Sequence, residues 1–325
     1  MDNWKRLEGE SDIEWELRVC LAKKRNQCDL DWSEIIDLLN LDISPDQLRK
    51  QAVGYVRYDD YIKGYQSVAT RILSISDLHV PFQLPIETFK DYIGITDILQ
   101  INGDLCDCLA LSKFTKLYRV DPMLELIEAR QYLINLVEYI KPRQVIITTG
   151  NHDERFGKYF AKKLDTDFLN KLLPTNSIEL MVEDGFHYYD VQSKTKTYYP
   201  PLQEVFTDVK ITYAHDWKVK IGKAWFCHPL AFRSGILSTA QKAKNYLQDI
   251  DKESFDTVVM AHTHRVGETK IGNVNLYEQG ACCYVDKMAY TDRRMQQPQK
   301  EGFMFICQDK DGNLIKDKTK LIELN

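Results

Sequence analysis

Five short clusters of metal-competent side chains recur along this 325-residue sequence. Each cluster follows a short apolar run of the kind that forms a buried strand. The clusters are Ser76-Asp77-Leu78-His79, Gly103-Asp104-Leu105-Cys106-Asp107, Gly150-Asn151-His152-Asp153, Cys227-His228 and Ala261-His262-Thr263-His264. Ligand-binding loops of α/β folds follow the carboxyl ends of strands. The sequence therefore predicts that the five clusters meet at one site.

The spacing within these clusters suits metal binding. Residues two apart on an extended segment lie on one side, so Asp77 and His79 can reach one cation, while His262 and His264 can present imidazoles to one cleft. A glycine before Asp104 lets the backbone turn sharply, and a carboxylate there can bridge two cations. Nitrogen and oxygen ligands without sulfur suit manganese, iron, zinc or nickel. We expect a site for two divalent ions, with manganese the first choice.

Seven apolar, partly β-branched runs are expected to form the strands that position these clusters. They are Ile72–Ile75, Asp97–Ile101, Gln144–Thr148, Val209–Tyr213, Ala224–Cys227, Thr257–Met260 and Val274–Tyr277. A helical pattern over Met123–Ile140 places Leu124, Ile127, Tyr132 and Leu136 on one apolar stripe. Alternating strands and helices predict an α/β core.

Residues 1 to 68 are expected to form a separate module of three short helices, and residues 69 to 325 the catalytic domain. The third helix has a clear start, because Ser44 can cap its N-terminus and Pro45 suits the first helical position. We expect this helix to run from Pro45 to about Tyr58.

Composition narrows the protein class. The 43 basic and 48 acidic side chains give a net charge of −5, which indicates no general affinity for polyanions. The eight cysteines include no Cys-x-x-Cys pair and are expected to be reduced thiols. The first residues lack an apolar signal core, and no run has the roughly 20 apolar residues of a membrane span. These features predict a soluble cytoplasmic protein.

With its motifs DLH, GDLCD, GNHD, His228 and AHTH in this order, the sequence resembles the calcineurin-like metallophosphoesterase superfamily over roughly residues 70 to 310. The resemblance implies an α/β sandwich of two mixed sheets flanked by helices. It also implies that one metal is held by Asp77, His79 and His264, the other by Asn151, His228 and His262, and that Asp104 bridges them. His152 would be an acid that binds no metal. Ala261 stands where the family usually has glycine, a change that affects only backbone shape.

Two positions in the motifs leave alternatives. His187, His215 and His228 all lie in the interval of the fourth motif. We favour His228 because it follows a strand-like run, and His215 remains the alternative. Asp107 could orient a ligand or cap the helix that follows, and the cap is the favoured interpretation.

The expected reaction is hydrolysis of a phosphate ester by a hydroxide that bridges the two cations. His152 is placed to give a proton to the departing alkoxide, and Asp153 is its expected orienting partner. Arg155 could contact a substrate phosphate, although an arginine just inside a helix is more often a surface group.

The substrate class is less well defined. Protein phosphatases of this superfamily usually carry GDYVDRG and GNHE, whereas this chain has GDLCDCL and GNHD, so that activity is disfavoured. The three N-terminal helices resemble a helix-turn-helix, and this combination resembles phage-type DNA-processing proteins. Arg49, Lys50 and Arg57 could then face DNA.

Residues 1 to 69 nevertheless carry a net charge of −4, which suits a protein-docking or oligomerisation module at least as well. The sequence therefore predicts a DNA nuclease, with a nucleotide or small-molecule phosphodiesterase, whose N-terminal helices serve self-association, as the alternative. A third hypothesis, a non-catalytic binding module with a vestigial site, is disfavoured by the intact ligand set.

Overall fold

The structure is a computed structural model that describes residues 4–66, 68–112, 121–161, 176–287 and 299–324. The chain divides into two compact units, Met1–Val68 and Ala69–Asn325. Among the helices of the described residues, none combines the length and hydropathy that a membrane span needs.

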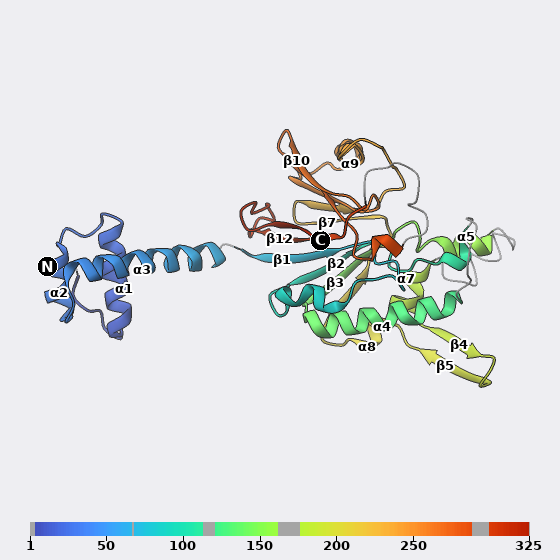
Figure 1. The fold of residues 1–325 in the computed structure, drawn as a ribbon, viewed down its shortest axis with the longest axis horizontal. Helices are drawn as coiled ribbons and strands as arrows, with labels where there is room; N and C mark the ends of the chain where they lie inside the picture. Colours follow the sequence, from blue (N-terminus) through green and yellow to red (C-terminus); the bar gives the residue numbers. More distant parts are fainter. Residues whose placement is uncertain (1–3, 67, 113–120, 162–175, 288–298, 325) are drawn as a thin grey trace. The chain divides into compact units, whose positions relative to one another are not determined.

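The first unit contains three helices, α1 (Asp12–Lys24), α2 (Trp32–Leu39) and α3 (Pro45–Gln66), as the sequence predicts (Figure 1). Capping boxes start the first two, with Ser11 and Glu14 at α1 and Asp31 and Glu34 at α2. The helices enclose a small core that consists of Val19, Cys20, Ala22, Cys28, Ile35, Leu39, Leu48 and Ala52. The apolar faces of the three helices therefore pack against one another.

Helix α3 begins as predicted but is longer than expected. The Ser44 hydroxyl accepts a hydrogen bond from the Gln47 amide at 3.3 Å, which confirms the cap. The expected end near Tyr58 is wrong, because the helix continues to Gln66. Just beyond the expected end, Asp59 forms an ion pair at 2.5 Å with Arg25, the residue that follows α1.

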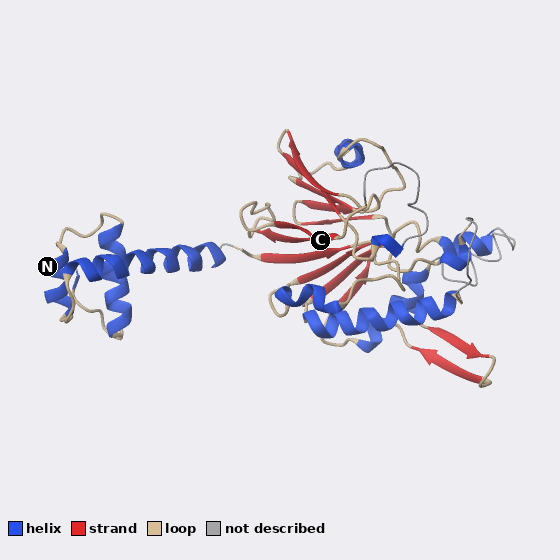
Figure 2. Ribbon diagram, viewed as in Figure 1, coloured by secondary structure: helices blue, strands red, loops and turns tan. Residues whose placement is uncertain are grey.

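The second unit is built from two mixed sheets (Figure 2). The six-stranded sheet has the order β13-β12-β1-β2-β3-β6, and the five-stranded sheet has the order β10-β11-β9-β8-β7. The first sheet contains β1 (Thr70–Ile75), β2 (Ile98–Asn102), β3 (Gln144–Thr148), β6 (Lys210–Tyr213), β12 (Gly302–Gln308) and β13 (Lys320–Glu323). The second contains β7 (Lys218–Ile221), β8 (Ala224–Cys227), β9 (Thr257–Met260), β10 (Val266–Ile271) and β11 (Val274–Gln279). A separate hairpin consists of β4 (Phe186–Asp190) and β5 (Thr195–Tyr199).

The parallel part of each sheet carries the predicted strands. Strands β1, β2, β3 and β6 are parallel, as are β8, β9 and β11. All seven runs predicted from the sequence form strands in this part of the fold. The inner faces of the sheets share a core of Ile72, Ala224, Phe226, Val259, Tyr277, Met304 and Ile306. The predicted sandwich of two mixed sheets is confirmed.

Two longer helices accompany the sheets, α4 (Pro122–Ile140) and α9 (Ser238–Ile250). Figure 1 shows α4 running along the six-stranded sheet. Helix α9 buries Ala240, Ala243 and Leu247 with side chains of β8, β9 and β11. The shorter elements are η2 (Ile86–Tyr92), η3 (Leu109–Leu111), α5 (Arg155–Ala161), α7 (Ser177–Glu179), η4 (Leu180–Asp184), α8 (Leu202–Val205) and η5 (Val285–Lys287).

The predicted helix at Met123–Ile140 is confirmed, but its predicted stripe is partly wrong. Leu124 is 47% exposed, whereas Leu126, Ala129 and Leu133 are buried. Two residues correspond to roughly 200° around a helix, so burial of Leu126 turns Leu124 to solvent. The stripe that packs is therefore offset from the one inferred from the sequence.

Candidate metal centre

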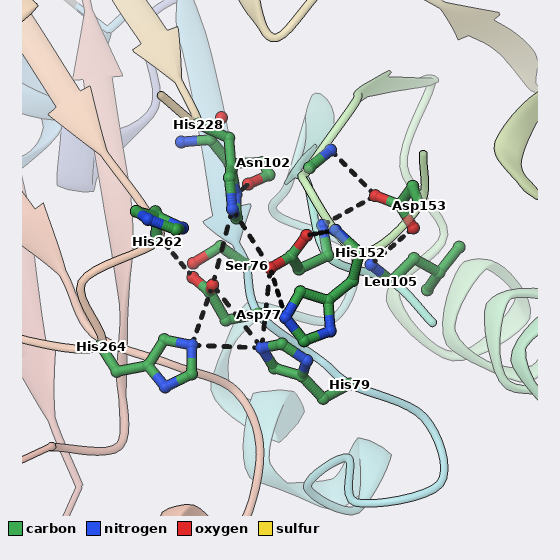
Figure 3. Close-up of polar contacts among 12 residues, drawn as sticks. Ser76, Asp77, His79, Asn102, Leu105, His152, Asp153, His228, His262 and His264 are labelled. Carbon is green, nitrogen blue, oxygen red and sulfur yellow. Dashed lines mark hydrogen bonds and ion pairs between the residues drawn. The ribbon is translucent and has the colours of Figure 1, made fainter. Parts of the chain in front are cut away.

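The five motifs meet where the two sheets converge. Asp77 and Asp104 follow β1 and β2, and Asn151 follows β3, all from the six-stranded sheet. His228 follows β8 and His262 follows β9, both from the five-stranded sheet. Figure 3 shows the imidazoles and carboxylates from these loops pointing toward one another. The parallel strands thus bring their polar carboxyl ends to one place.

The backbone at this site adopts an unusual conformation. Five of the candidate ligands have left-handed φ values between 46° and 81°, namely Asp77, His79, Asp104, His262 and His264. Residues other than glycine rarely adopt this conformation, which costs of order 1 kcal/mol or more at each position. Hydrogen bonds between loops maintain it, from the Asp77 amide to the Gly103 carbonyl at 3.1 Å and from the His79 amide to the Asp104 carbonyl at 3.0 Å. The surrounding fold therefore fixes the side-chain directions.

Asp77, His79 and His264 form the first group of ligands. Each offers one atom, and these atoms lie within 4.8 Å of one another. His264 Nε2 is 3.1 Å from Asp77 Oδ1 and 3.1 Å from His79 Nε2. All three residues are buried. One carboxylate and two imidazoles in this arrangement can hold a divalent cation.

Asp104, His228 and His262 form the second group, and their ligand atoms also lie within 4.8 Å of one another. Asp104 Oδ2 is 3.2 Å from His228 Nε2 and 3.8 Å from His79 Nε2, so one carboxylate oxygen lies close to both groups. Asn151 adjoins the site at the end of β3. This position of Asp104 is the geometry that a bridging ligand needs.

Two buried atoms test whether these residues fit a metal. Within the described residues, Asn151 Oδ1 has no hydrogen-bond partner, and His228 Nε2 lies 3.2 Å from the Asp104 carboxylate. The opposite nitrogen of His228, Nδ1, lies 2.7 Å from the Asn102 carbonyl and donates its proton there, which directs Nε2 into the site. A buried polar atom without a partner is costly, and a cation would supply a partner for Asn151 Oδ1. The donor set therefore fits divalent metal ions.

The electrostatics of the cluster favour positive charge at its centre. Burial disfavours the charged form of His228, but the Asp104 and Asp77 carboxylates outweigh burial and raise its pKa to about 10. Burial and the nearby charge on His228 lower the pKa of His262 to about 4. Although burial opposes it, the histidines hold the pKa of Asp77 well below its usual range. The two carboxylates thus stay ionised and attract a proton or a cation.

Asp107 has the role that the sequence left as the alternative, which is to orient a ligand. Its Oδ1 lies 3.2 Å from His79 Nδ1 and 3.0 Å from His152 Nδ1, and the residue is buried. The favoured interpretation, a helix cap, is wrong, because the following element η3 has no side-chain cap. Burial alone would raise the pKa of Asp107, yet the hydrogen bonds from His152 and His79 hold it below the usual range. Asp107 therefore orients two histidines at once.

Asp153 does not contact the imidazole of His152, so its expected role as the orienting partner is wrong. Its Oδ2 accepts hydrogen bonds from the amides of Asp104 at 2.8 Å and Gly150 at 2.9 Å. Its Oδ1 accepts from the Leu105 amide at 3.2 Å. These backbone donors engage both carboxylate oxygens, so Asp153 fastens the second motif to the third.

Arg155 lies beside His152. Its Nη1 donates to the Asp107 carbonyl at 2.6 Å, and its Nη2 is 2.9 Å from His152 Nε2. Guanidinium nitrogens only donate, so Nε2 accepts here and the imidazole proton is on Nδ1, toward Asp107. The structure therefore brings the predicted substrate-binding residue directly to the predicted proton donor.

The remaining candidates lie away from the cluster or in the other unit. His215 is exposed, pairs with Glu183 at 3.0 Å and belongs to a separate acidic group with Glu179 and Glu183, so His228 and not His215 joins the two groups formed by the motifs. His187 is exposed on β4. In the N-terminal unit, Arg49 and Lys50 both pair with Asp46, at 2.7 and 2.9 Å, and Arg57 is exposed.

Comparison with known proteins gives one family assignment. The model of the calcineurin-like phosphoesterase family matches residues 70–266, more than half of the chain. No curated protein sequence matches. Similar solved structures include Vps29 from Entamoeba histolytica complexed with zinc, at 13% identity and a TM-score of 0.38 over 78% of this chain and 98% of that one. They also include Vps29 from Cryptosporidium parvum, at 13% identity and a TM-score of 0.35 over 79% and 99% of the two chains.

A third similar structure is an archaeal phosphodiesterase, at 15% identity and a TM-score of 0.35 over 78% of this chain and 100% of that one. The family assignment depends on the family match and on the five motifs within the matched range. The chain therefore belongs to the calcineurin-like phosphoesterase family of metal-dependent hydrolases.

Proposed function

We propose that this chain is a two-metal phosphodiesterase whose substrate is DNA. The observation that carries the proposal is the position of His152 at the edge of the two ligand groups. Its Nε2 is 3.9 Å from Asp104 Oδ2, and its Nδ1 is held by Asp107. A leaving alkoxide bound next to the metals would thus meet an oriented imidazole.

In this proposal one cation is held by Asp77, His79 and His264, and the other by Asn151, His228 and His262. Asp104 contacts both, which its short distances to His228 and His79 support. The cations would polarise the phosphoryl group and lower the pKa of a water molecule. Manganese is the first choice because the ligands are nitrogen and oxygen atoms.

His152 and Arg155 have different roles toward the substrate, proton donation and phosphate binding. Arg155 binds a phosphoryl oxygen through its guanidinium, for which its planar donors are well suited. Because Arg155 also occupies His152 Nε2, substrate binding has to draw the guanidinium away from that nitrogen. Nε2, once released, would take up a proton from solvent, and Asp107 at Nδ1 would stabilise the resulting imidazolium. His152 would then give the Nε2 proton to the leaving oxygen and return to the neutral form that is protonated at Nδ1.

The proposal of DNA as the substrate depends on the N-terminal unit. One observation there favours the second candidate function, a nucleotide or small-molecule phosphodiesterase. The basic residues Arg49 and Lys50 share one acidic partner, Asp46, instead of forming a cluster of uncompensated charge. Exposed ion pairs are weak, so phosphates could displace them. The same surface suits self-association of a nucleotide or small-molecule phosphodiesterase.

The test is manganese-dependent hydrolysis by the purified full chain of single-stranded DNA, duplex DNA and bis-p-nitrophenyl phosphate. His152→Ala and Asp104→Asn serve as controls for contaminating nucleases. DNA cleavage that both substitutions abolish is the expected result. Hydrolysis of the small ester with DNA left intact would replace DNA with the second candidate, and hydrolysis of neither would reject both.

A further inference from the structure

A pocket of about 340 Å³ adjoins the candidate metal centre. Asn151 and His228 form part of its wall, so it opens beside the proposed second metal. The His228 amide donates to the Trp217 carbonyl at 2.8 Å, which links the pocket wall directly to a candidate ligand. None of the roles proposed for His152, Asp107 and Arg155 uses this space.

The rest of the wall is largely apolar and partly aromatic. It includes Trp217, Leu230, Ala243 and Tyr246. The rings of Trp217 and Tyr246 lie with their centroids 5.6 Å apart and their planes at 45°. Tyr246 is 48% exposed and Leu230 is 69% exposed, so apolar surface faces solvent beside a charged centre. An exposed apolar wall of this kind marks a binding site more often than a packing defect.

The loop that carries Leu230 is held in place by a residue next to a candidate ligand. Arg265 follows His264 and donates to the carbonyls of Arg233 at 3.0 Å and Gly235 at 3.3 Å. Its guanidinium also lies 4.8 Å from the ring centroid of Phe232. These contacts connect the loop that follows Leu230 to the segment that carries His264.

The size and the chemistry of the pocket select the ligand. Its volume is at the lower end of the range for small-molecule sites, roughly 300 to 1,000 Å³, so it suits one compact group. Aromatic rings on the wall suit a flat partner that can stack. Exposed Lys242 on the same wall supplies a cation for a neighbouring phosphate.

We infer that this pocket binds a single nucleobase, the base of the nucleotide whose phosphate is cleaved. The inference depends on the proposed phosphodiesterase function and narrows its substrate class to nucleotide esters. The base packs against Tyr246 and Leu230 while its phosphate reaches the cation that Asn151 and His228 would hold. One unstacked base at a time fits, which a single strand or a free nucleotide can present more readily than an intact duplex.

The test is calorimetric titration of the manganese-loaded full chain with three phosphates: thymidine 5′-monophosphate, 2-deoxyribose 5-phosphate and hexyl phosphate. Stacking of one base is expected to make the nucleotide bind about 5-fold to 100-fold more tightly than the sugar phosphate. Tyr246→Ala and Leu230→Gln are expected to reduce that ratio at least about threefold and to leave the sugar phosphate affinity unchanged.

Tyr189→Ala is the matched control, because Tyr189 is similarly exposed, at 55%, and lies on the β4 hairpin outside the pocket. Equal affinities for the nucleotide and the sugar phosphate would overturn the inference, as would hexyl phosphate binding as tightly as the nucleotide. Hydrolysis of bis-p-nitrophenyl phosphate by the same preparation separates failure of the pocket inference from failure of the proposed phosphodiesterase function. Hydrolysis without a base effect overturns only the pocket, whereas no hydrolysis and no phosphate binding overturn the phosphodiesterase function too.

Discussion

Replacing Asp107 with asparagine tests whether one carboxylate organises the site. Both imidazoles, from His79 and His152, meet the same oxygen, Oδ1, at 3.2 and 3.0 Å. An amide oxygen can take that position, so Asp107→Asn keeps the shape and the accepting oxygen while it removes the charge. The main-chain carbonyl of Asp107, 2.9 Å from His152 Nδ1, is the same in both proteins. The perturbation therefore isolates the electrostatic part of the interaction.

The expected loss of activity in Asp107→Asn follows from the two hydrogen bonds. A hydrogen bond to a charged group contributes about 1.5 to 3 kcal/mol and a neutral one about 0.5 to 1.5 kcal/mol, so each bond loses roughly 1 to 1.5 kcal/mol. Two bonds together lose about 2 to 3 kcal/mol, which corresponds to a roughly 30-fold to 150-fold fall in kcat/KM. Outer partners of metal-binding histidines show losses of similar size, about 10-fold to 100-fold.

The assay is manganese-dependent hydrolysis of bis-p-nitrophenyl phosphate, with circular dichroism and bound metal measured on the same samples. Glu125→Gln is the matched control, because it also replaces a carboxyl group that is 1% exposed with an amide, and it is expected to keep full activity. Asp107→Ala removes the acceptors too and is expected to lose at least as much activity as Asp107→Asn. If Asp107→Asn keeps kcat/KM within twofold of the unmodified protein, the charge at this position does not organise the histidines.

Three further outcomes are expected. His152→Ala should retain its bound manganese by elemental analysis while turnover falls about 100-fold to 10,000-fold; unchanged turnover would remove His152 as the proton donor. Manganese at about 1,000 times its Kd should stabilise the fold by about 4 kcal/mol, seen as a higher melting temperature that EDTA reverses and that Asp104→Ala lacks; an equal shift in that variant would place the metal elsewhere. Burial, helped by the charge on Asp107, raises the pKa of Glu125 from 4.5 to about 8, so between these values the folded protein holds a proton that the unfolded chain releases. The free energy of unfolding should therefore fall as pH rises through this window, and urea titrations of Glu125→Gln should show a shallower fall than the unmodified protein; parallel curves would contradict the assignment.

The strands and the site were predictable from the sequence for the same reason. Runs such as Ile72–Ile75 and Thr257–Met260 are apolar and rich in β-branched residues. Each is followed by polar residues of a kind that an apolar core rarely contains. Strand geometry then required the polar ends to converge, which the structure confirms for Asp77, Asp104 and His228.

The contacts that the sequence did not reveal depend on tertiary neighbours. Asp107 meets His79, 28 residues earlier, and His152, 45 residues later, so a local pattern could not decide between a cap and the orientation of a ligand. Asp153 is adjacent to His152 in sequence, but its carboxylate accepts hydrogen bonds from the backbone amides of Asp104 and Leu105, which lie in another loop. Just past the expected end of helix α3, Asp59 pairs with Arg25, the residue that follows α1, which is a contact that no local pattern shows.

The assembly of the candidate metal centre from two sheets has a consequence for folding kinetics. Asp77 and His264 lie 3.1 Å apart although 187 residues separate them along the chain. Contacts over such separations form slowly, since closing the intervening loop costs entropy before any contact compensates for it. A chain with only one sheet assembled lacks half of the ligands, so a cation stabilises chiefly the completed fold. Bound metal should therefore slow unfolding far more than it accelerates folding, and the lifetime of the folded domain becomes a function of the free cation concentration.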